Sequence, residues 1–578
     1  MKTSLKITLL AIFLTTAACQ PEIAAPPVPI STTQPVQAPT QAQLPSPTSL
    51  PATPTSSPTP EEPEVQEGIP ESFWWNDTVF YEIFVRSFKD SDGDGVGDLN
   101  GVIEMLDYLN DGDPETSTDL GISGIWLMPI TESPSYHGYD VVDYYAIDQE
   151  YGSKEDFLRL MEEAHKRGIK VIVDLVINHT GFDHPWFQAS RAEDPVYRGW
   201  YVWEDSNPGF LGPWGQPVWH RSGNSYYYAI FWDRMPDLNF ENPVVTDEIY
   251  EITRFWLKEM QVDGFRMDAI RHLIESGPVQ ENTYETHAWL QAYHQFYKSV
   301  AADAFTVGEA WTYTEQVVDY VGDEMDIAFE FDLAEAFLVA AKGPIVVALK
   351  DQVQKVLDSF PEGQYGVFLT NHDQNRVMFN LQEETAAKLA ATMMLTFPGV
   401  PFIYYGEEIG MIGSKPDEDI RLPMQWSGEA AGGFTSGTPW RAPYPDYSTR
   451  NVAAQSGDPA SLLTHYKTLI QLRNQHAALR TGRAVQVDSG SPRLYALLRY
   501  NTEEAFLVLV NPHPSDLQLD QYSLKLESGP FSGTVQAEAV LGPADPKAPV
   551  INAQGGFEGY QPFEVLPAKS SLIIRLAP

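Results

Sequence analysis

The sequence is poor in cysteine, in basic residues and in long apolar runs. Cys19 is the only cysteine among 578 residues, which excludes an intramolecular disulfide, a cysteine-based zinc site and an iron–sulfur cluster. Lys and Arg number 37 against 79 Asp and Glu, a formal net charge of −42. Because so acidic a surface repels phosphate backbones and anionic lipids, we expect no nucleic-acid partner. Neutral substrates remain compatible with this charge.

Apolar residues are otherwise plentiful. Hydrophobic residues make up 43% and aromatic residues 12% of the chain, enough for a large core. At about 100–200 residues per domain, the length indicates several domains or one large barrel with appendages. The first apolar run, Ile7–Leu14, follows Lys2 and Lys6 and leads through small residues to Cys19. This arrangement is typical of an export signal, and the run is too short for a membrane-spanning helix, which needs about 20 apolar residues.

A cysteine directly after small residues resembles the lipobox of bacterial lipoproteins. In that family the cysteine carries the lipid, although Thr16 stands here where Leu is usual. We expect residues 1–18 to be a lipoprotein signal peptide and Cys19 the lipidation site, with an ordinary secretory signal as the alternative. Residues 19–71 are rich in Pro, Thr and Ser and lack aromatic and basic residues, which predicts a disordered tether. The predicted location is a membrane-anchored protein of the periplasm or cell surface.

From residue 72 on, short apolar runs alternate with amphipathic stretches. The runs are 80–88, 122–130, 169–177, 262–267, 305–309, 327–331, 365–370 and 401–405. Eight such strands with helices between them predict a parallel sheet covered on both faces. Eight strands close a (β/α)8 barrel, which we assign to residues 72–178 and 240–480. A doubly wound open sheet is the alternative, and it is disfavoured because no Gly-rich fingerprint follows the first strand.

Two segments depart from this alternation. Residues 179–239 are rich in Trp, Tyr, Pro and Gly and follow the third strand, which predicts an inserted subdomain. A long loop at the carboxyl end of a barrel strand lies over the active site of such folds. After residue 480 the pattern changes to short alternating segments, which predicts a C-terminal antiparallel β-sandwich over residues 481–578.

Carboxylates stand at the ends of three predicted strands. Asp268, Glu309 and Asp373 follow strands four, five and seven, so the barrel brings them to one rim. Arg266 precedes the first of them by two positions, and His372 stands next to the last. Like charges held close together raise one pKa, which prepares one group to act as an acid. Two carboxylates of unequal pKa are what glycoside hydrolysis requires.

These residues belong to the last three of four strings that occur in order: DLVINH, GFRMD, VGEAW and TNHD. The strings resemble the signature regions of the α-amylase family, glycoside hydrolase family 13, and the resemblance runs from about residue 73 to the C-terminus. It implies a retaining glycoside hydrolase that acts on α-glucosidic bonds. By this resemblance Asp268 is the nucleophile, Glu309 the general acid/base and Asp373 the carboxylate that stabilises the transition state.

The resemblance also implies a set of residues that bind the sugar at the cleavage point. These are Tyr139, His179, Arg266, His372 and Arg421. Tyr139 is expected to stack on the sugar ring. The fixed charge of Arg266 is expected to keep Asp268 ionised while Glu309 stays protonated.

Calcium is the predicted cofactor. Residues 90–98 place carboxylates at alternate positions with glycines between them, a spacing similar to an EF-hand loop without its twelfth-position Glu. The expected ligands are Asp90, Asp92, Asp94, Asp98 and the carbonyl of Val96. The α-amylase family carries such a loop after strand one; a solvated acidic turn is the alternative. A second site, between barrel and insertion, matches the family at Asn178, Asp237 and the carbonyl of His272.

The type of enzyme is less closely determined. The string Met235–Asn239 is similar to sequences intermediate between oligo-1,6-glucosidases and neopullulanases, and Tyr136 stands where exo-acting α-glucosidases carry an acid. We therefore expect an endo-acting α-amylase on starch or malto-oligosaccharides, with pullulan cleavage or transglycosylation as side activities. The alternatives are an exo-acting α-glucosidase, a trehalose-type isomerase or transglycosylase, and a non-catalytic glucan-binding lipoprotein. Four tryptophans of the insertion are either sugar platforms or packing residues: Trp203, Trp214, Trp219 and Trp232.

Overall fold

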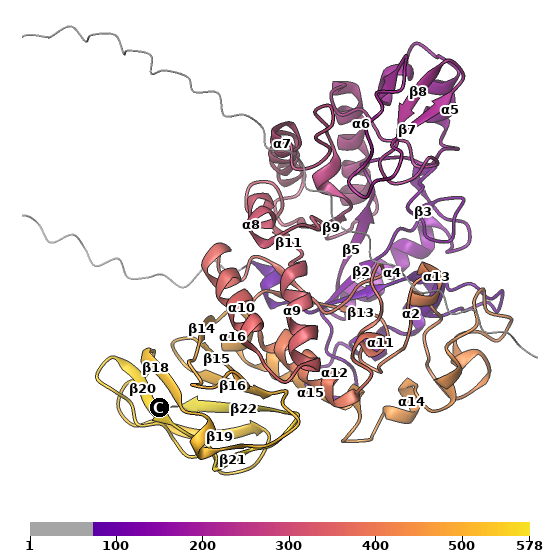
Figure 1. The fold of residues 1–578 in the computed structure, drawn as a ribbon. Coiled ribbons are helices and arrows are strands. Elements are labelled where there is room, and N and C mark those ends of the chain that lie inside the picture. Colours follow the sequence, from indigo (N-terminus) through magenta and orange to yellow (C-terminus); the bar gives the residue numbers. More distant parts are fainter. Residues whose placement is uncertain (1–72, 578) are drawn as a thin grey trace, which may run out of the picture. The chain divides into compact units, whose positions relative to one another are not determined.

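The computed structural model describes residues 73–577. The predicted signal peptide, Cys19 and the tether lie outside these residues. Eight parallel strands form one sheet in the order β11-β10-β9-β5-β2-β1-β13-β12. Figure 1 labels β2, β5, β9, β11 and β13 of this sheet. Their bounds are β1 Phe80–Ile83, β2 Gly124–Leu127, β5 Lys170–Leu175, β9 Gly264–Met267, β10 Phe305–Gly308, β11 Ile327–Ala328, β12 Gly366–Val367 and β13 Val400–Tyr404.

A parallel bridge between Phe329 and Gly366 joins the two edge strands, so the sheet closes into a barrel. The structure thus confirms the predicted fold class. Seven of the eight strands are shorter than the apolar runs that predicted them, because the end of each run turns into a loop; β13 has the length of its run but begins one residue earlier. The run over 365–370 shows this most clearly, since only Gly366 and Val367 pair as strand β12.

Aromatic side chains fill the lower part of the barrel. Phe80 of β1 stacks on Phe305 of β10 and on Phe402 of β13, with ring centroids 5.4 and 4.7 Å apart. Trp126 and Phe329 join the same buried cluster. The barrel is therefore a packed core, and the space for a ligand lies at the carboxyl ends of the strands.

Amphipathic helices cover the outside of the barrel. The longer ones are α4 Lys154–Lys166, α6 Pro243–Arg254, α7 Tyr284–Val300, α9 Phe331–Lys342, α10 Val347–Ser359, α12 Glu384–Thr396 and α15 Leu462–Gln475. Helix α4 is capped by Ser153, whose hydroxyl accepts from the backbone N–H of Asp156, while the Asp156 carboxylate accepts in return from the Ser153 N–H. Its buried face carries Phe157 and Leu160, so the sequence pattern and the cap select the same boundaries.

The insertion after β5 carries a small antiparallel sheet of β6 Trp203–Glu204, β8 Ser225–Tyr228 and β7 Trp219–Ser222, and one short helix, α5 Pro185–Arg191. Antiparallel bridges pair His179 with Asp237 and Tyr201 with Leu238. The segment therefore leaves the barrel and returns at nearly the same point. This places its two ends beside the rim where the catalytic candidates gather.

The C-terminal part is an antiparallel sheet domain. Its main sheet has the order β14-β15-β16-β22-β19, with bounds Arg483–Gln486, Tyr495–Tyr500, Ala505–Asn511, Ser570–Ala577 and Gln536–Leu541. Two smaller pairs are β17 Leu517–Gln518 with β21 Val565–Leu566, and β18 Leu524–Ser528 with β20 Gly555–Tyr560. All seven residues of β16 are buried, because one face packs on the barrel core and the other on the domain's own core. None of the helices within residues 73–577 is long and apolar enough to cross a membrane.

Candidate active site

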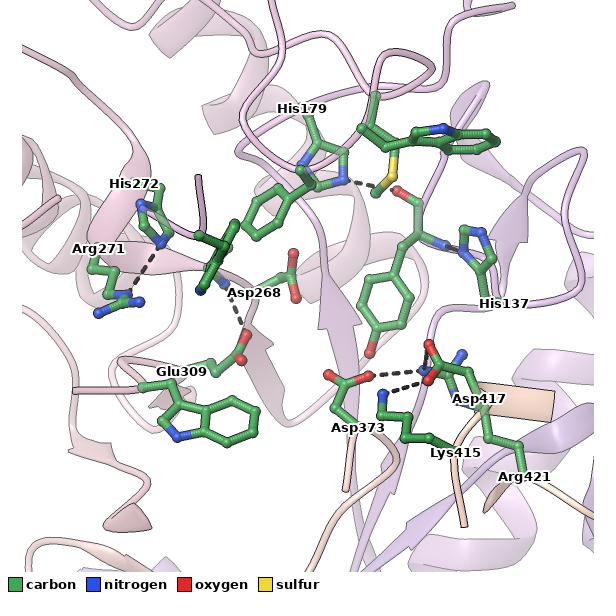
Figure 2. Close-up of a pocket in the computed structure, with 17 residues that line it drawn as sticks. His137, His179, Asp268, Arg271, His272, Glu309, Asp373, Lys415, Asp417 and Arg421 are labelled. Atoms are coloured by element: carbon green, nitrogen blue, oxygen red, sulfur yellow. Dashed lines mark hydrogen bonds and ion pairs between the residues drawn. The ribbon is translucent and has the colours of Figure 1, made fainter. Parts of the chain in front are cut away.

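A cavity of about 780 Å³ opens at the carboxyl ends of the barrel strands. Figure 2 shows Asp268, Glu309 and Asp373 pointing toward this space. They follow β9, β10 and β12, so three separate strands deliver them. Six of the eight predicted catalytic and sugar-binding residues line the cavity: Tyr139, His179, Asp268, Glu309, Asp373 and Arg421. Arg266 and His372 lie directly behind them, in contact with these carboxylates.

Arg266 holds the first two carboxylates together. Its side chain is 1% exposed, with Nη1 2.6 Å from Asp268 Oδ1 and Nη2 2.6 Å from Glu309 Oε2. Nη1 also lies 2.8 Å from Asp174 Oδ1 on the neighbouring strand β5. One guanidinium therefore fixes the relative position of Asp268 and Glu309. The sequence predicted an ionic contact of Arg266 with Asp268 only.

Burial raises the pKa of Asp268 to about 6, against the opposing charge of Arg266. It also raises the pKa of Glu309; Arg266 lowers that pKa, and the nearby charges of Asp268 and Asp373 raise it further. Asp268 is therefore ionised above about pH 6. The raised pKa of Glu309 extends the range over which it carries a proton, as a general acid must.

Asp373 lies in a contrasting environment. Its Oδ1 accepts from Arg421 Nη2 at 2.8 Å, and its Oδ2 lies 3.2 Å from His372 Nε2. Although burial alone would raise its pKa, the charges of His372 and Arg421 hold the pKa well below the ordinary value. Asp373 therefore stays ionised at neutral and mildly acidic pH.

The two candidate histidines differ in charge. His179 is 1% exposed, and burial lowers its pKa to about 4, so it is neutral at pH 7. Its Nε2 lies 3.1 Å from the carbonyl of Tyr139. His372 is equally buried, yet Asp373 and Glu82 outweigh the effect of burial and raise its pKa to about 9. The ring of Tyr139 stacks on His372, with centroids 5.5 Å apart.

Several residues at the site were not predicted. Asp174 accepts hydrogen bonds from Arg266 and from the Tyr139 hydroxyl, and Glu82 contacts His372. Both stand inside apolar strand runs, and a charged residue in such a run is the signal that could have identified them. Lys415 and Asp417 form an ion pair at the cavity. Nothing local in the sequence marks this pair, because its position depends on the path of the loop after β13.

The four tryptophans of the insertion divide into two pairs. Trp214 and Trp232 line the cavity and are 58% and 49% exposed. Trp203 lies under the Arg198 guanidinium, and Trp219 packs edge-on against Tyr228 within the insertion. The first pair is therefore available to a ligand, and the second pair stabilises the insertion.

The acidic loop after β1 gathers three of its four aspartates. Carboxylate oxygens of Asp90, Asp92 and Asp98 all lie within 4.8 Å of one another. Asp94 lies outside this group, and its Oδ1 accepts from the backbone N–H of Val96 at 2.8 Å. Three hard oxygen donors so close together suit a cation such as calcium, so the residues present fit the predicted metal.

The second predicted metal position also contains oxygens that need a partner. Asn178 Nδ2 donates to Asp237 Oδ2 at 3.1 Å, whereas Asn178 Oδ1 is buried and has no hydrogen-bond partner among residues 73–577. Glu275, which was not predicted, adds a buried Oε1 that has no hydrogen-bond partner in the described part of the chain. Burial and the charge of Asp237 raise the pKa of Glu275 well above its ordinary value. The side chain of His272 lines the catalytic cavity.

Comparison with known proteins agrees with this geometry. Residues 82–482 match the family model described as the α-amylase catalytic domain. The chain is 38% identical to Alpha-amylase 3 of Dictyoglomus thermophilum over 76% of this chain and 85% of that protein. It is 33% identical to an oligo-1,6-glucosidase of Heyndrickxia coagulans over 78% of this chain and 94% of that protein. The crystal structure of an α-amylase from H. orenii superposes with a TM-score of 0.74 at 39% identity, covering 86% of this chain and 99% of that one.

Proposed function

This chain belongs to the α-amylase family of glycoside hydrolases, and on that premise we propose that it is a retaining, endo-acting hydrolase of α-1,4-glucans such as starch and maltodextrins. The observation that carries the proposal is the pair Asp268 and Glu309, held on neighbouring nitrogens of Arg266 at the floor of one cavity. Retaining enzymes need two carboxyl groups only about 5 Å apart, and a shared guanidinium imposes such closeness.

The residues divide the two steps of the reaction among them. Asp268 attacks the anomeric carbon while Glu309 transfers its proton to the glycosidic oxygen, and the leaving chain departs with that proton. Glu309, now ionised, takes a proton from water, whose oxygen displaces Asp268 and restores both groups. Asp373 keeps its negative charge throughout and stabilises the positive charge that develops on the sugar ring.

Endo action is supported by the outer part of the cavity. Trp214, Trp232 and Trp311 line it and remain 44–58% exposed, so their rings are available to several sugar units. Tyr136 stacks on Trp440 with ring centroids 5.6 Å apart, an aromatic contact at the position where exo-acting relatives carry an acid. The alternative is an exo-acting α-glucosidase, which the similarity to a protein named oligo-1,6-glucosidase favours.

Product analysis separates these activities. We expect amylose to lose its iodine colour early, while few reducing ends have formed, because internal bonds are cut. Maltotriose, maltose, pullulan and sucrose serve as comparison substrates. Release of glucose from chain ends alone, or formation of disaccharide isomers, would contradict endo action.

We propose calcium as the cation of the loop that carries Asp90, Asp92 and Asp98. Chelation is expected to lower the melting temperature by a few degrees and added calcium to restore it. A ligand present at a hundred times its Kd stabilises a protein by about 2.7 kcal/mol. The Asp90→Asn variant should show a smaller difference, whereas Asp113→Asn, in an exposed acidic turn, should respond like the parent protein. Identical melting curves with and without chelator would contradict the proposal.

We also propose that the chain is an exported lipoprotein anchored through Cys19, on the basis of the lipobox-like sequence alone. Mass spectrometry of the mature protein should find a diacylglyceryl group on an N-terminal Cys19. An unmodified mature N-terminus at another residue would overturn this assignment.

A further inference from the structure

Glu82 is a buried carboxylate on the first barrel strand, directly below the catalytic rim. It is 2% exposed, and its neighbours in the sheet are Trp126 of β2 and Tyr404 of β13. Its Oε1 lies 2.6 Å from Nδ1 of His372. A carboxylate so deep in a barrel is stable only with a hydrogen-bonded or charged partner, and His372 provides that partner.

The other nitrogen of His372 also faces oxygen. Nε2 lies 3.2 Å from Oδ2 of Asp373 and 2.6 Å from the hydroxyl of Tyr139. A neutral imidazole has one donor and one acceptor nitrogen, so it would turn a lone pair toward one of the two carboxylates. The arrangement is satisfied in full when both nitrogens carry a proton, that is, when His372 is an imidazolium.

We propose that Glu82 is a positioning residue of the catalytic site, which fixes a proton on Nδ1 of His372 and through the resulting cation keeps Asp373 ionised and oriented toward the sugar. This inference rests on the proposed function for the part that Asp373 plays. It adds to that function a chain of three groups that extends from the first strand to the cavity: the buried Glu82 and His372, and Asp373, which is partly exposed at the cavity.

The surroundings of His372 support a permanent charge. Asp174 of β5 is close enough for the charges of the two side chains to interact, and Arg421 donates its Nε to the His372 carbonyl at 3.0 Å. His179 provides an internal comparison: it is as deeply buried but has no carboxylate on either nitrogen, and burial lowers its pKa to about 4. The carboxylates, rather than burial, therefore account for the pKa of about 9 at His372.

The Glu82→Gln variant removes the charge and keeps the shape and the hydrogen bond. In the parent enzyme, NMR signals of the His372 ring, assigned through a His372→Asn variant, should show the imidazolium up to about pH 9. In Glu82→Gln the midpoint should fall by at least about one pH unit, since the nearest of the two compensating charges is lost. An unchanged midpoint would overturn the proposal. This measurement does not depend on the substrate, so its outcome is separate from that of the proposed function.

Activity supplies a second readout. The ratio of parent to Glu82→Gln kcat/KM should rise at least about twofold between pH 5.5 and pH 8, because a midpoint lowered from about 9 by one pH unit leaves half of the variant without the His372 proton at pH 8. Taking the ratio cancels the titration of Glu309. The matched control is Glu408→Gln: Glu408 is also fully buried, but its carboxylate accepts hydrogen bonds from Tyr81 and Tyr108 and from no histidine within residues 73–577. Its ratio should stay constant, and a constant ratio for Glu82→Gln would contradict the proposal.

A neutron structure of the parent enzyme at pH 7 keeps the inference testable if the variant does not fold. Deuterium on both ring nitrogens of His372, with Glu82 and Asp373 unprotonated, is the expected result. A bare nitrogen on His372 would overturn the proposal.

Discussion

The Asp268→Asn variant is expected to fold normally and to lose at least about four orders of magnitude in kcat, since removing a residue of a catalytic unit commonly costs that much or more. The amide keeps the size of the carboxylate, and its oxygen can still accept from Arg266 Nη1, which lies 2.6 Å from Oδ1 in the parent protein. It cannot form the covalent glycosyl intermediate, because an amide oxygen is a poor nucleophile.

The same change is expected to stabilise the protein at pH 7. Burial raises the folded-state pKa of Asp268 to about 6 from 3.8, so between these values the folded state holds a proton that the unfolded state has released. The free energy of unfolding of the parent protein therefore falls as pH rises through this window. Above pH 6 the buried charge of Asp268 destabilises the folded state to its full extent. Asn has no charge to bury, so the variant should gain up to about 3 kcal/mol at pH 7 and nothing below pH 4.

Measurement requires both activity and melting curves. Asp183→Asn is the matched control, because Asp183 pairs with Arg234 at the exposed surface of the insertion and should change neither quantity much. Azide should restore turnover to Asp268→Ala and yield a glycosyl azide of inverted configuration, which only loss of the nucleophile explains. A fully active Asp268→Asn enzyme would exclude the assignment.

Much of the barrel and its carboxylate rim was predictable, and the reason is local. Each strand is a short apolar run, and each candidate carboxylate stands at the end of one or within three residues after it, so the topology of the barrel alone brings Asp268, Glu309 and Asp373 to one rim. The acidic loop was also predictable from local sequence, because its aspartates are spaced at alternate positions. Asp94 has the same spacing, but its carboxylate accepts from the Val96 N–H and lies outside the group. This orientation depends on backbone torsions, which the spacing does not predict.

The features that escaped prediction depend on contacts between distant segments. Arg266 stands beside Asp268 in sequence, yet its contact with Glu309 exists only because β9 and β10 are neighbours in register. Glu82 and His372 are 290 residues apart. Glu82 is on β1 and His372 follows β12, and β13 lies between these two strands, so strand pairing does not reveal that the side chains meet. The state of charge at this site is therefore a property of the closed barrel rather than of any motif.

Loss of Arg266 should damage stability and catalysis together. Its side chain, 1% exposed, is the shared partner of Asp174, Asp268 and Glu309. In Arg266→Met these buried carboxylates lose that charge, and breaking a buried ion pair costs about 3–5 kcal/mol. The carboxylates can recover part of this cost only by binding protons, so their pKa values should rise further. Asp268 would then be protonated near neutral pH, and we expect kcat to fall by at least about a thousandfold.

The pH dependence identifies the cause. Because the folded-state pKa values rise, the folded state binds more protons than the unfolded state, and the stability deficit of Arg266→Met should grow from pH 5 to pH 8. Arg473→Met is the matched control: Arg473 is equally buried but donates to the backbone carbonyls of Leu395, Phe397 and Gly399. It should lose stability to a similar extent at both pH values and keep its activity per folded molecule. The stability and activity of Arg266→Lys should lie between those of Arg266→Met and those of the parent protein, since an ammonium retains the charge but cannot span both catalytic carboxylates. A deficit in Arg266→Met that is independent of pH would show that the guanidinium acts by packing rather than by charge.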